Sequence, residues 1–396
     1  MHLRTHASLH FQDVFMAEIK NLTKAANRIL KAIANRERII LYGDSDPDGV
    51  SSVLILEETM RALGAKSVKV YFPDRETEGY GINGGAMRVL KRYAPALFIT
   101  LDCGITNIKE TEIAKKMGFE VMIVDHHKVL ARLPKASIIV DPKQKGDKSS
   151  AKELACAGIV YKLAQNIFKL AQKQWEPERF LELAALATIA DQMPTEQENE
   201  KIIREGLGAL RYTKRPAFEE LINLTGYNHG GSGEFREKLL PALNVWSARR
   251  HINPIYEFLT ETSAAKAKKM AQSFLRQAKE RKKELRDIYE AADARVAFSK
   301  EPIIFEGDSS WPLVFSGAMA SRLCHKYKKP IFIYKKGRKE SPGAARTPRG
   351  IDVVEMMDEC KKFMITYGGH PQAGGFRAKN KDLDKLKACL LEQIAR

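Results

Sequence analysis

The stretch Ile39-Ile40-Leu41-Tyr42-Gly43-Asp44-Ser45-Asp46-Pro47-Asp48-Gly49 decides the fold of this chain. An apolar run typical of a buried strand leads directly into three crowded aspartates. Carboxylates lose hydration on burial and repel one another, so crowding them at a strand end costs free energy unless a cation binds there. The stretch therefore predicts a strand whose carboxyl end holds metal.

Two further apolar runs end in the same way. The run Leu97–Leu101 leads into Asp102, and the run Val121–Val124 leads into the triplet Asp125-His126-His127. In an open α/β sheet, ligands bind at the carboxyl ends of the strands. Several strands that deliver Asp and His to one edge predict a site for more than one metal ion.

Two other interpretations of the first aspartate group are weaker. Asp-x-Asp-x-Asp-Gly also opens a calcium-binding EF-hand loop, but the twelfth position, which should be Glu, is Ile55. An EF-hand also needs a helix before the loop, where this chain has strand residues. Solvated turn acids remain an alternative for the first group alone, and the other Asp-tipped strands count against it.

Length and composition indicate a folded protein of two or three domains. The chain has 396 residues, of which 44% are hydrophobic. No apolar stretch is long enough to span a bilayer, and Met1–His6 lacks the apolar region of a secretory signal. We therefore expect a cytoplasmic protein with no membrane partner.

The cysteines predict neither a zinc ribbon nor a disulfide framework. They are scattered, contain no Cys-x-x-Cys pair and fit a reducing compartment. Their expected role is that of small buried hydrophobic residues. The five are Cys103, Cys156, Cys324, Cys360 and Cys389.

The charge balance points to a polyanionic partner. The formal net charge is +17, and a protein this basic that also carries an acidic metal cluster is expected to meet nucleic acid. The alternative is that the basic charge serves solubility or reflects the proteome of the host.

Strands and helices alternate from Ile39 to Pro142, which predicts a mostly parallel sheet covered by helices on both faces. A helix from Met16 to Asn35 is expected before the first strand. Further helices are expected at 50–63, 84–93, 108–117, 154–172 and 177–189. The expected strands are 39–42, 67–72, 97–101, 120–124 and 137–140.

One long helix is expected from Thr262 to Ala294, because apolar residues recur there at helical spacing. Its other face is heavily charged. That face is either the solvated side of a helix lying across two domains or a basic track for a phosphate backbone. A new apolar run, Pro302–Phe305, then opens a separate small α/β domain.

Together these motifs resemble the DHH phosphoesterase superfamily over nearly the whole chain. The namesake triplet is Asp125-His126-His127, preceded by 43–49 and 102–104 and followed by Ala190-Asp191. The segment 368–376, Gly-Gly-His-Pro-Gln-Ala-Gly-Gly-Phe, is similar to the signature of the associated DHHA1 domain. RecJ-type single-strand exonucleases are the most similar branch, on the further segments 73–81, 152–158 and 198–199.

The resemblance implies the architecture. It implies a mostly parallel-sheet DHH domain at 1–258, a linking helix at 259–297 and a smaller α/β DHHA1 domain at 298–396. The active site would lie in the cleft between the two domains. The chain would be a minimal core form, without the additional domains of long bacterial RecJ proteins.

The resemblance also implies a site for two divalent metal ions, with Mn²⁺ preferred over Mg²⁺. Asp102 would bridge the ions, Asp125 would orient a histidine, and His127 would contact the scissile phosphate or assist the leaving group. Asp102, Asp125, His126 and His127 form the implied catalytic set. The implied metal ligands are Asp44, Asp46, Asp48, Asp102, His126 and Asp191.

Substrate contacts are implied for residues of both domains: Arg75, Arg249, Arg346, Gly368, Gly369 and His370. Arg75 could instead be a surface charge, and the Gly-Gly pair could be a simple turn. Two departures from the RecJ pattern concern recognition of the strand end. One extra residue precedes Arg249, and Ala344 stands where RecJ proteins usually carry a serine.

The function implied is metal-dependent exonuclease cleavage of single-stranded nucleic acid, DNA in preference to RNA, in DNA repair. Replication or repair proteins are implied as further partners. One alternative is a nanoRNase or phosphoesterase acting on short oligonucleotides, cyclic dinucleotides or nucleoside bisphosphates. Another is a replication scaffold without catalysis. The intact ligand set counts against the scaffold, since a scaffold gains nothing from so many crowded carboxylates.

Overall fold

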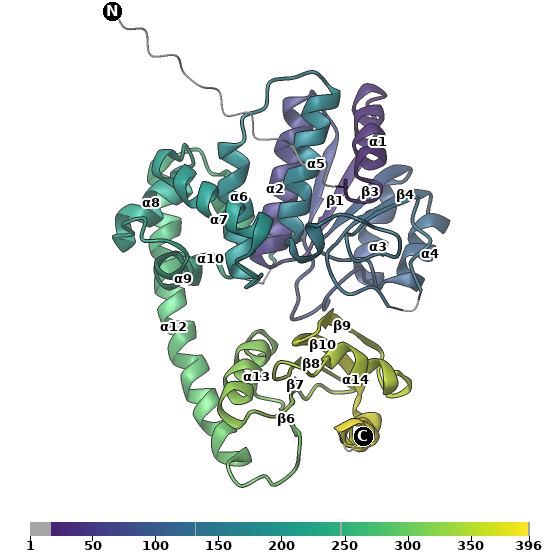
Figure 1. Ribbon diagram of the computed structural model, residues 1–396, viewed down its shortest axis with the longest axis vertical. Coiled ribbons are helices and arrows are strands. Elements are labelled where there is room, and N and C mark those ends of the chain that lie inside the picture. Colours follow the sequence, from purple (N-terminus) through teal and green to yellow (C-terminus); the bar gives the residue numbers. More distant parts are fainter. Residues whose placement is uncertain (1–16, 131, 246–247, 395–396) are drawn as a thin grey trace, which may run out of the picture.

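The computed structural model describes residues 17–130, 132–245 and 248–394, and the segment Met1–His6 considered above lies outside this part. It has two lobes, each built on a five-stranded sheet, with one long helix running between them (Figure 1). None of the helices in the described ranges is long and apolar enough to cross a membrane.

The first lobe contains an entirely parallel sheet, as the sequence predicts. The strand order is β2-β1-β3-β4-β5. All five expected strands are present, at β1 (Ile39–Gly43), β2 (Val68–Tyr71), β3 (Ala96–Leu101), β4 (Phe119–Val124) and β5 (Ile138–Val140).

Both faces of this sheet are covered, and β1 shows how. Ile39 and Leu41 point into the core under α1, α2 and α5, whereas Ile40 and Tyr42 point into the core under α3 and α4. Because successive side chains alternate between faces, a strand buried on both sides must be apolar throughout. These helices are α1 (Leu22–Ala34), α2 (Pro47–Ala62), α3 (Gly84–Leu90), α4 (Ile108–Lys116) and α5 (Cys156–Leu170).

The start of the first helix differs from the expectation. Helix α1 begins at Leu22, because Asn21 takes a left-handed conformation (φ 68°) that ends the helix there. Residues 17–21 are not helical, and Met16 lies outside the described residues.

A helical layer continues the first lobe beyond α5. It comprises α6 (Glu178–Ala190), α7 (Gln197–Ala209), α8 (Pro216–Thr225), α9 (Ser232–Lys238), α10 (Leu240–Leu243) and α11 (Pro254–Thr260). The long helix α12 (Ala264–Val296) follows, and the Ser263 side chain caps it by accepting a hydrogen bond from Lys266 N. The long helix is thus confirmed to within two residues of each expected end.

Helix α12 packs on α8 and α10 at its start and on α13 and β6 at its end, so it joins the two lobes along one side (Figure 1). The solvated-linker interpretation of its charged face fits this position. The division into 1–258, 259–297 and 298–396 stays a prediction, and its terminal residues 1–16 and 395–396 lie outside the described part.

The second lobe has a mixed sheet of order β6-β7-β8-β10-β9. Only β6 and β7 pair in parallel, and the other pairs are antiparallel. Helix α13 (Leu313–Tyr327) lies on one face, with α14 (Val353–Glu359) and α15 (Leu383–Ile394) on the other. The strands are β6 (Ile304–Asp308), β7 (Ile331–Lys335), β8 (Glu340–Arg346), β9 (Thr366–His370) and β10 (Ala373–Lys379).

The cysteines differ from the expectation in one respect. Cys103, Cys156 and Cys324 are free and buried, as predicted, but Cys360 and Cys389 form a disulfide. The packing of α15 against the end of α14 brings their Cα atoms to 5.9 Å. Nothing in their spacing of 29 residues signals this pairing.

Candidate metal centre

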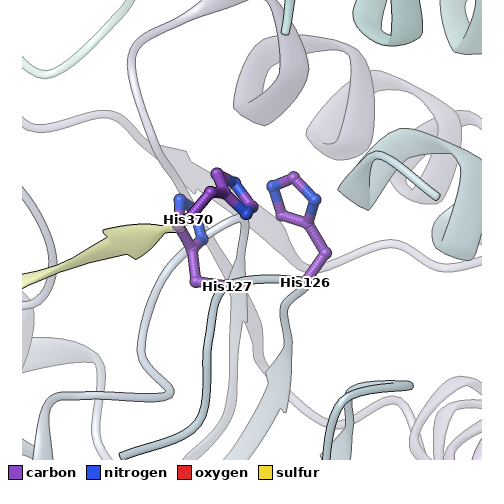
Figure 2. A group of neighbouring side chains, drawn as sticks. All are labelled: His126, His127 and His370. Atoms are coloured by element: carbon purple, nitrogen blue, oxygen red, sulfur yellow. The ribbon is translucent and has the colours of Figure 1, made fainter. Parts of the chain in front are cut away.

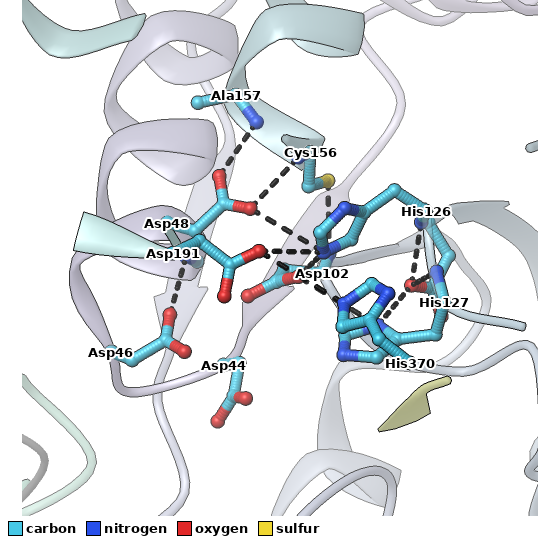
Figure 3. A network of polar contacts seen from close by, with 12 residues as sticks. Asp44, Asp46, Asp48, Asp102, His126, His127, Cys156, Ala157, Asp191 and His370 are labelled. Atoms are coloured by element: carbon cyan, nitrogen blue, oxygen red, sulfur yellow. Dashed lines mark hydrogen bonds and ion pairs between the residues drawn. The ribbon is translucent and has the colours of Figure 1, made fainter. Parts of the chain in front are cut away.

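Three neighbouring strands of the first sheet deliver the acidic residues to one edge. Asp44 follows β1, Asp102 follows β3 and Asp125 follows β4, and all three side chains are buried. Figure 3 shows Asp44 and Asp102 in one cluster with residues from α2, α6 and β9. The structure therefore brings these strand-end residues together at one edge of the sheet.

The start of α2 places the next two aspartates. Asp46 caps this helix, since its Oδ1 accepts a hydrogen bond from Gly49 N at 2.9 Å. Gly49 lies so close to Asp44 that an added Cβ would be 2.3 Å from the Asp44 carbonyl oxygen, so the turn requires glycine. Asp48 is buried and accepts hydrogen bonds from the first backbone N–H groups of α5, Cys156 N at 2.8 Å and Ala157 N at 2.7 Å.

His126 is oriented to act as a ligand. Its Nδ1 lies 3.1 Å from the carbonyl oxygen of Leu154, which leaves Nε2 to face the carboxylates. That Nε2 atom is 3.2 Å from Asp102 Oδ1 and 3.6 Å from both Asp48 Oδ2 and Asp191 Oδ2. Asp191 reaches the cluster from the C-terminal end of α6.

Ionisation of the carboxyl groups in the cluster is unfavourable in the absence of a cation. Burial and the neighbouring acids raise the pKa of Asp48 and Asp102 well above the ordinary value, and the same two causes raise the pKa of Asp191 to about 7. Asp102 Oδ1 and Asp191 Oδ2 are buried and have no hydrogen-bond partner among the described residues. Buried oxygens without partners are the groups that a bound cation satisfies.

The ligand atoms fall into two groups that share one residue. Asp44, Asp46 and Asp102 form one group, and Asp48, Asp102 and His126 form the other, each with ligand atoms within 4.8 Å of one another. Oxygen-rich sites with one imidazole suit Mn²⁺ or Mg²⁺. The residues therefore fit the pair of divalent ions that the sequence implies, and Asp102 belongs to both groups.

Asp125 and His127 form a pair beside this cluster. Asp125 Oδ1 lies 2.7 Å from His127 Nδ1, and its Oδ2 accepts a hydrogen bond from Ile105 N. Although burial opposes both charges, the pairing lowers the pKa of Asp125 to about 2 and raises that of His127 to about 8. Asp125 therefore orients His127, and the Tyr80 hydroxyl lies 3.2 Å from the same Nδ1.

Arg75 lies inside the acidic cluster rather than in open solvent. Its guanidinium forms ion pairs with Asp44 and, at 2.9 Å, with Asp46. Burial opposes its charge, but the two carboxylates outweigh this effect and raise the pKa of Arg75. The surface-charge alternative for Arg75 is therefore wrong, although its contacts are with predicted metal ligands.

The second lobe contributes His370, at the end of β9. Its ring centroid lies 4.7 Å from that of His126 and 4.8 Å from that of His127 (Figure 2). The preceding glycines allow this approach. Gly368 faces Thr106 of the first lobe, and Gly369 has φ 132°, with an added Cβ only 2.3 Å from the Ala373 carbonyl oxygen. The Gly-Gly pair lies inside strand β9 and pairs with Gly374 and Gly375 of β10, so the simple-turn alternative is wrong, and Gly368 is part of the interface between the lobes.

The two remaining predicted substrate contacts lie further out. Arg346 is the last residue of β8, and its Nε donates a hydrogen bond to Ser321 Oγ at 3.1 Å. Burial lowers the pKa of Arg346, whereas the negative charge of nearby Asp191 raises it. Arg249 lies in a tight turn closed by its backbone pairing with Ile252, and its side chain is exposed. The structure thus brings Arg346 towards the cluster and leaves Arg249 at the surface.

The fifth strand adds residues that the sequence interpretation missed. Asp141 and Lys143 follow β5, and Lys143 Nζ lies 3.3 Å from His370 Nδ1. Asp141 is buried, and burial together with the nearby Asp125 raises its pKa to about 8. The signal was present, because Ile138–Val140 is another apolar run that ends in Asp.

Comparison with known proteins identifies the class. Residues 38–188 match the model of the DHH family, N-terminal domain. The chain therefore carries a DHH-family domain over these residues. It is 35% identical over 391 residues to the single-stranded-DNA-specific exonuclease RecJ of Bacillus subtilis and 29% identical over 386 residues to that of Thermus thermophilus. Each alignment covers 96% of this chain, but only 48% and 55% of the two relatives, so the chain spans about half their length.

Solved structures extend the similarity to the whole fold. A crystal structure of exonuclease RecJ bound to manganese aligns with a TM-score of 0.78 at 26% identity, covering 96% of this chain and 95% of that one. RecJ of Thermus thermophilus in complex with Mn²⁺ aligns with a TM-score of 0.79 at 25% identity, over 96% of this chain and 55% of that one. These matches confirm the expected architecture of two α/β lobes and a linking helix.

Proposed function

We propose that this chain hydrolyses phosphodiester bonds with two divalent metal ions, Mn²⁺ by preference and Mg²⁺ as the second choice. One observation carries the proposal: two groups made of predicted metal ligands, one with Asp44 and Asp46 and one with Asp48 and His126, share the buried Asp102. Asp44 and Asp46 would hold one ion, and Asp48, His126 and Asp191 the other. Such a pair supplies an activated hydroxide and stabilises the leaving oxygen.

The residues around the ligands serve the substrate. His127 is held by Asp125, and its raised pKa favours the protonated ring. A protonated His127 would interact with an anionic phosphate or with the leaving oxygen. His370 and Arg346 approach from the second lobe, and Gly368 and Gly369 bring backbone close to the same place. The roles of Arg75 and Arg249 as substrate contacts belong to the same proposal.

The proposed substrate is a single-stranded nucleic acid, DNA by preference, degraded from one end. The relatives named above are single-stranded-DNA-specific exonucleases, and the net charge of +17 favours a polyanion. Replication or repair proteins are the partners that fit such an activity, and the cytoplasm is the location that fits it.

End-labelled oligonucleotides test this proposal directly. We expect degradation of single-stranded DNA in Mn²⁺, slower degradation of RNA, little cutting of duplex DNA, and no activity in the Asp102→Ala variant. Affinity for a long single strand should fall steeply as salt rises, because bound Lys and Arg release counterions. Faster hydrolysis of a dinucleotide than of the long strand, with a flat salt dependence, would instead identify a small-substrate phosphoesterase.

A further inference from the structure

The loop after β5 holds a lysine at the metal centre in a fixed position. Asp141 Oδ1 accepts a hydrogen bond from Lys143 N at 2.7 Å, and Gln144 Nε2 donates to the Ile139 carbonyl oxygen at 3.0 Å. Lys152 Nζ binds the Pro142 carbonyl oxygen and, at 3.0 Å, that of Asp147. The loop is therefore tied at both ends, and Lys143 has little freedom to move away.

The contact between Lys143 and His370 fixes the hydrogen on the ring. Lys143 Nζ lies 3.3 Å from His370 Nδ1, and an ammonium group can only donate. Nδ1 of His370 must then accept, so the ring hydrogen is on Nε2. That Nε2 atom is buried, lies 3.9 Å from Asp191 Oδ2, a predicted metal ligand, and has no hydrogen-bond partner in the described part of the chain. A donor of this kind at a metal centre indicates a missing acceptor.

Burial lowers the pKa of Lys143, and an anionic acceptor beside its Nζ would favour the charged form. Within residues 17–130, 132–245 and 248–394, its ammonium forms no ion pair, and its one hydrogen-bonding partner is the His370 ring. The carboxyl groups of Asp125, Asp141, Glu153 and Asp191 and the rings of His126 and His127 surround it at longer range. A half-buried cation among metal ligands, without an ion pair of its own, is suited to a phosphate oxygen.

We propose that Lys143 is a further catalytic residue, whose ammonium group contacts a non-bridging oxygen of the scissile phosphate together with His370 Nε2–H. This inference rests on the proposed function and adds a specific contact to it. As negative charge grows on the phosphate oxygens in the transition state, the two donors stabilise it more than they stabilise the ground state.

Steady-state kinetics with Lys143→Met, Lys143→Arg and the exposed neighbour Lys145→Met test the catalytic role. Removing one preorganised donor should lower kcat by about 100-fold on single-stranded DNA and on bis-p-nitrophenyl phosphate. The kcat of Lys143→Arg should be at least tenfold higher than that of Lys143→Met, and the kcat of Lys145→Met should equal that of wild type. Mn²⁺ affinity, measured by calorimetry, should stay within twofold of wild type in all three variants. A kcat for Lys143→Met within threefold of wild type overturns the inference.

A binding experiment separates this inference from the proposed function. Thymidine 5′-monophosphate in Mn²⁺, titrated by calorimetry, should bind wild type at least tenfold more tightly than Lys143→Met. If wild type hydrolyses no nucleic acid yet binds the nucleotide in this Lys143-dependent manner, the proposed function fails and the phosphate contact stands. Equal binding by the two proteins, or no binding by wild type, overturns the contact whatever the activity.

Discussion

Lys128 of the first lobe forms an ion pair with Asp352 of the second lobe. Lys128 lies only two residues after His126, a predicted metal ligand. The same ammonium pairs with Glu355 at 3.0 Å, and Lys128 N donates to the Gly369 carbonyl oxygen. The chain that carries the Asp-His-His triplet is thus tied to the strand that carries His370. This connection holds the second lobe over the acidic cluster together with Glu76, which accepts a hydrogen bond from Val314 N and pairs with Lys335.

Replacing Lys128 with Met should loosen the second lobe without damaging the first. We expect KM for a single-stranded oligonucleotide to rise about threefold to tenfold, whereas the free energy of unfolding falls by about 1 kcal/mol at most, since the pair is partly exposed. Lys135→Met is the matched control, because it removes an exposed ion pair with Glu112 inside one lobe. Equal KM values for the two variants would contradict a role for Lys128 in holding the lobes.

Asp102→Ala should remove metal binding at both proposed positions. In wild type, Mn²⁺ should raise the Tm, because the ions offset repulsion among buried carboxylates. The variant should lose this rise, and its hydrolysis should fall by about 1000-fold or more. In EDTA, however, the variant should lose little stability, because relief of the buried, repelled carboxylate of Asp102 offsets the cost of placing Ala in the left-handed conformation found there (φ 62°). Thermal unfolding with and without Mn²⁺ measures both effects, and a normal Mn²⁺-induced rise in the variant would exclude the bridge.

Much of the metal centre could be predicted because its signal is local. Apolar strands that end in Asp44, Asp102 and Asp125 need only the rule that parallel strands share a carboxyl edge. Asp191 differs, because it ends a helix and only the family pattern pointed to it. Asp141 shows the same strand-end signal after β5, but Lys143 lies two residues further along in a loop, where no local pattern marks a lysine as part of the site.

Other features depend on contacts that no local pattern encodes. Arg75 lies in an irregular segment, so its reach to Asp44 and Asp46 follows from the path of the loop and not from any periodicity. The meeting of Cys360 and Cys389 depends likewise on how α15 returns across the second sheet. Such long-range packing overrides what residue spacing can show.

A pH-dependent contribution to stability is expected from Asp308, which joins the second lobe to α12. Hydrogen bonds from the Ser310 side chain and backbone and the ion pair with Arg295 lower the pKa of Asp308 from 3.8 to about 2. A lowered pKa in the folded state contributes stability above the unfolded value, and this contribution is lost as the pH falls through the folded value. Asp308→Asn should therefore lower the Tm at pH 7, and its difference from wild type should shrink between pH 4 and pH 2.

Thermal unfolding of wild type, Asp308→Asn and Arg295→Met across this pH range checks the expectation. Arg295→Met removes the ion pair, together with the Arg295 contacts to Glu306 and the Trp311 ring, but keeps the Ser310 hydrogen bonds. Its Tm difference from wild type should therefore shrink less between pH 4 and pH 2 than that of Asp308→Asn. A difference between wild type and Asp308→Asn that stays constant down to pH 2 would show that the carboxylate charge contributes nothing.

Variants of His370 and Arg346, the two residues of the second lobe that lie towards the acidic cluster, should differ in which substrates they impair. The His370 ring lies against His126 and His127, whereas the Arg346 guanidinium is held by Ser321 and reaches Asp191 only through longer-range attraction. Arg346→Ala should therefore raise KM for an oligonucleotide about tenfold to 100-fold, the range for losing a charged hydrogen bond, and leave hydrolysis of bis-p-nitrophenyl phosphate within twofold of wild type.

His370→Ala should lower kcat on both substrates, because its Nε2–H faces the place where any phosphodiester must react. Arg349→Ala, which removes an exposed charge three residues beyond Arg346, controls for the loss of general attraction to the strand. If Arg346→Ala impairs the small substrate as severely as the oligonucleotide, Arg346 completes the catalytic centre and does not bind the strand beyond it.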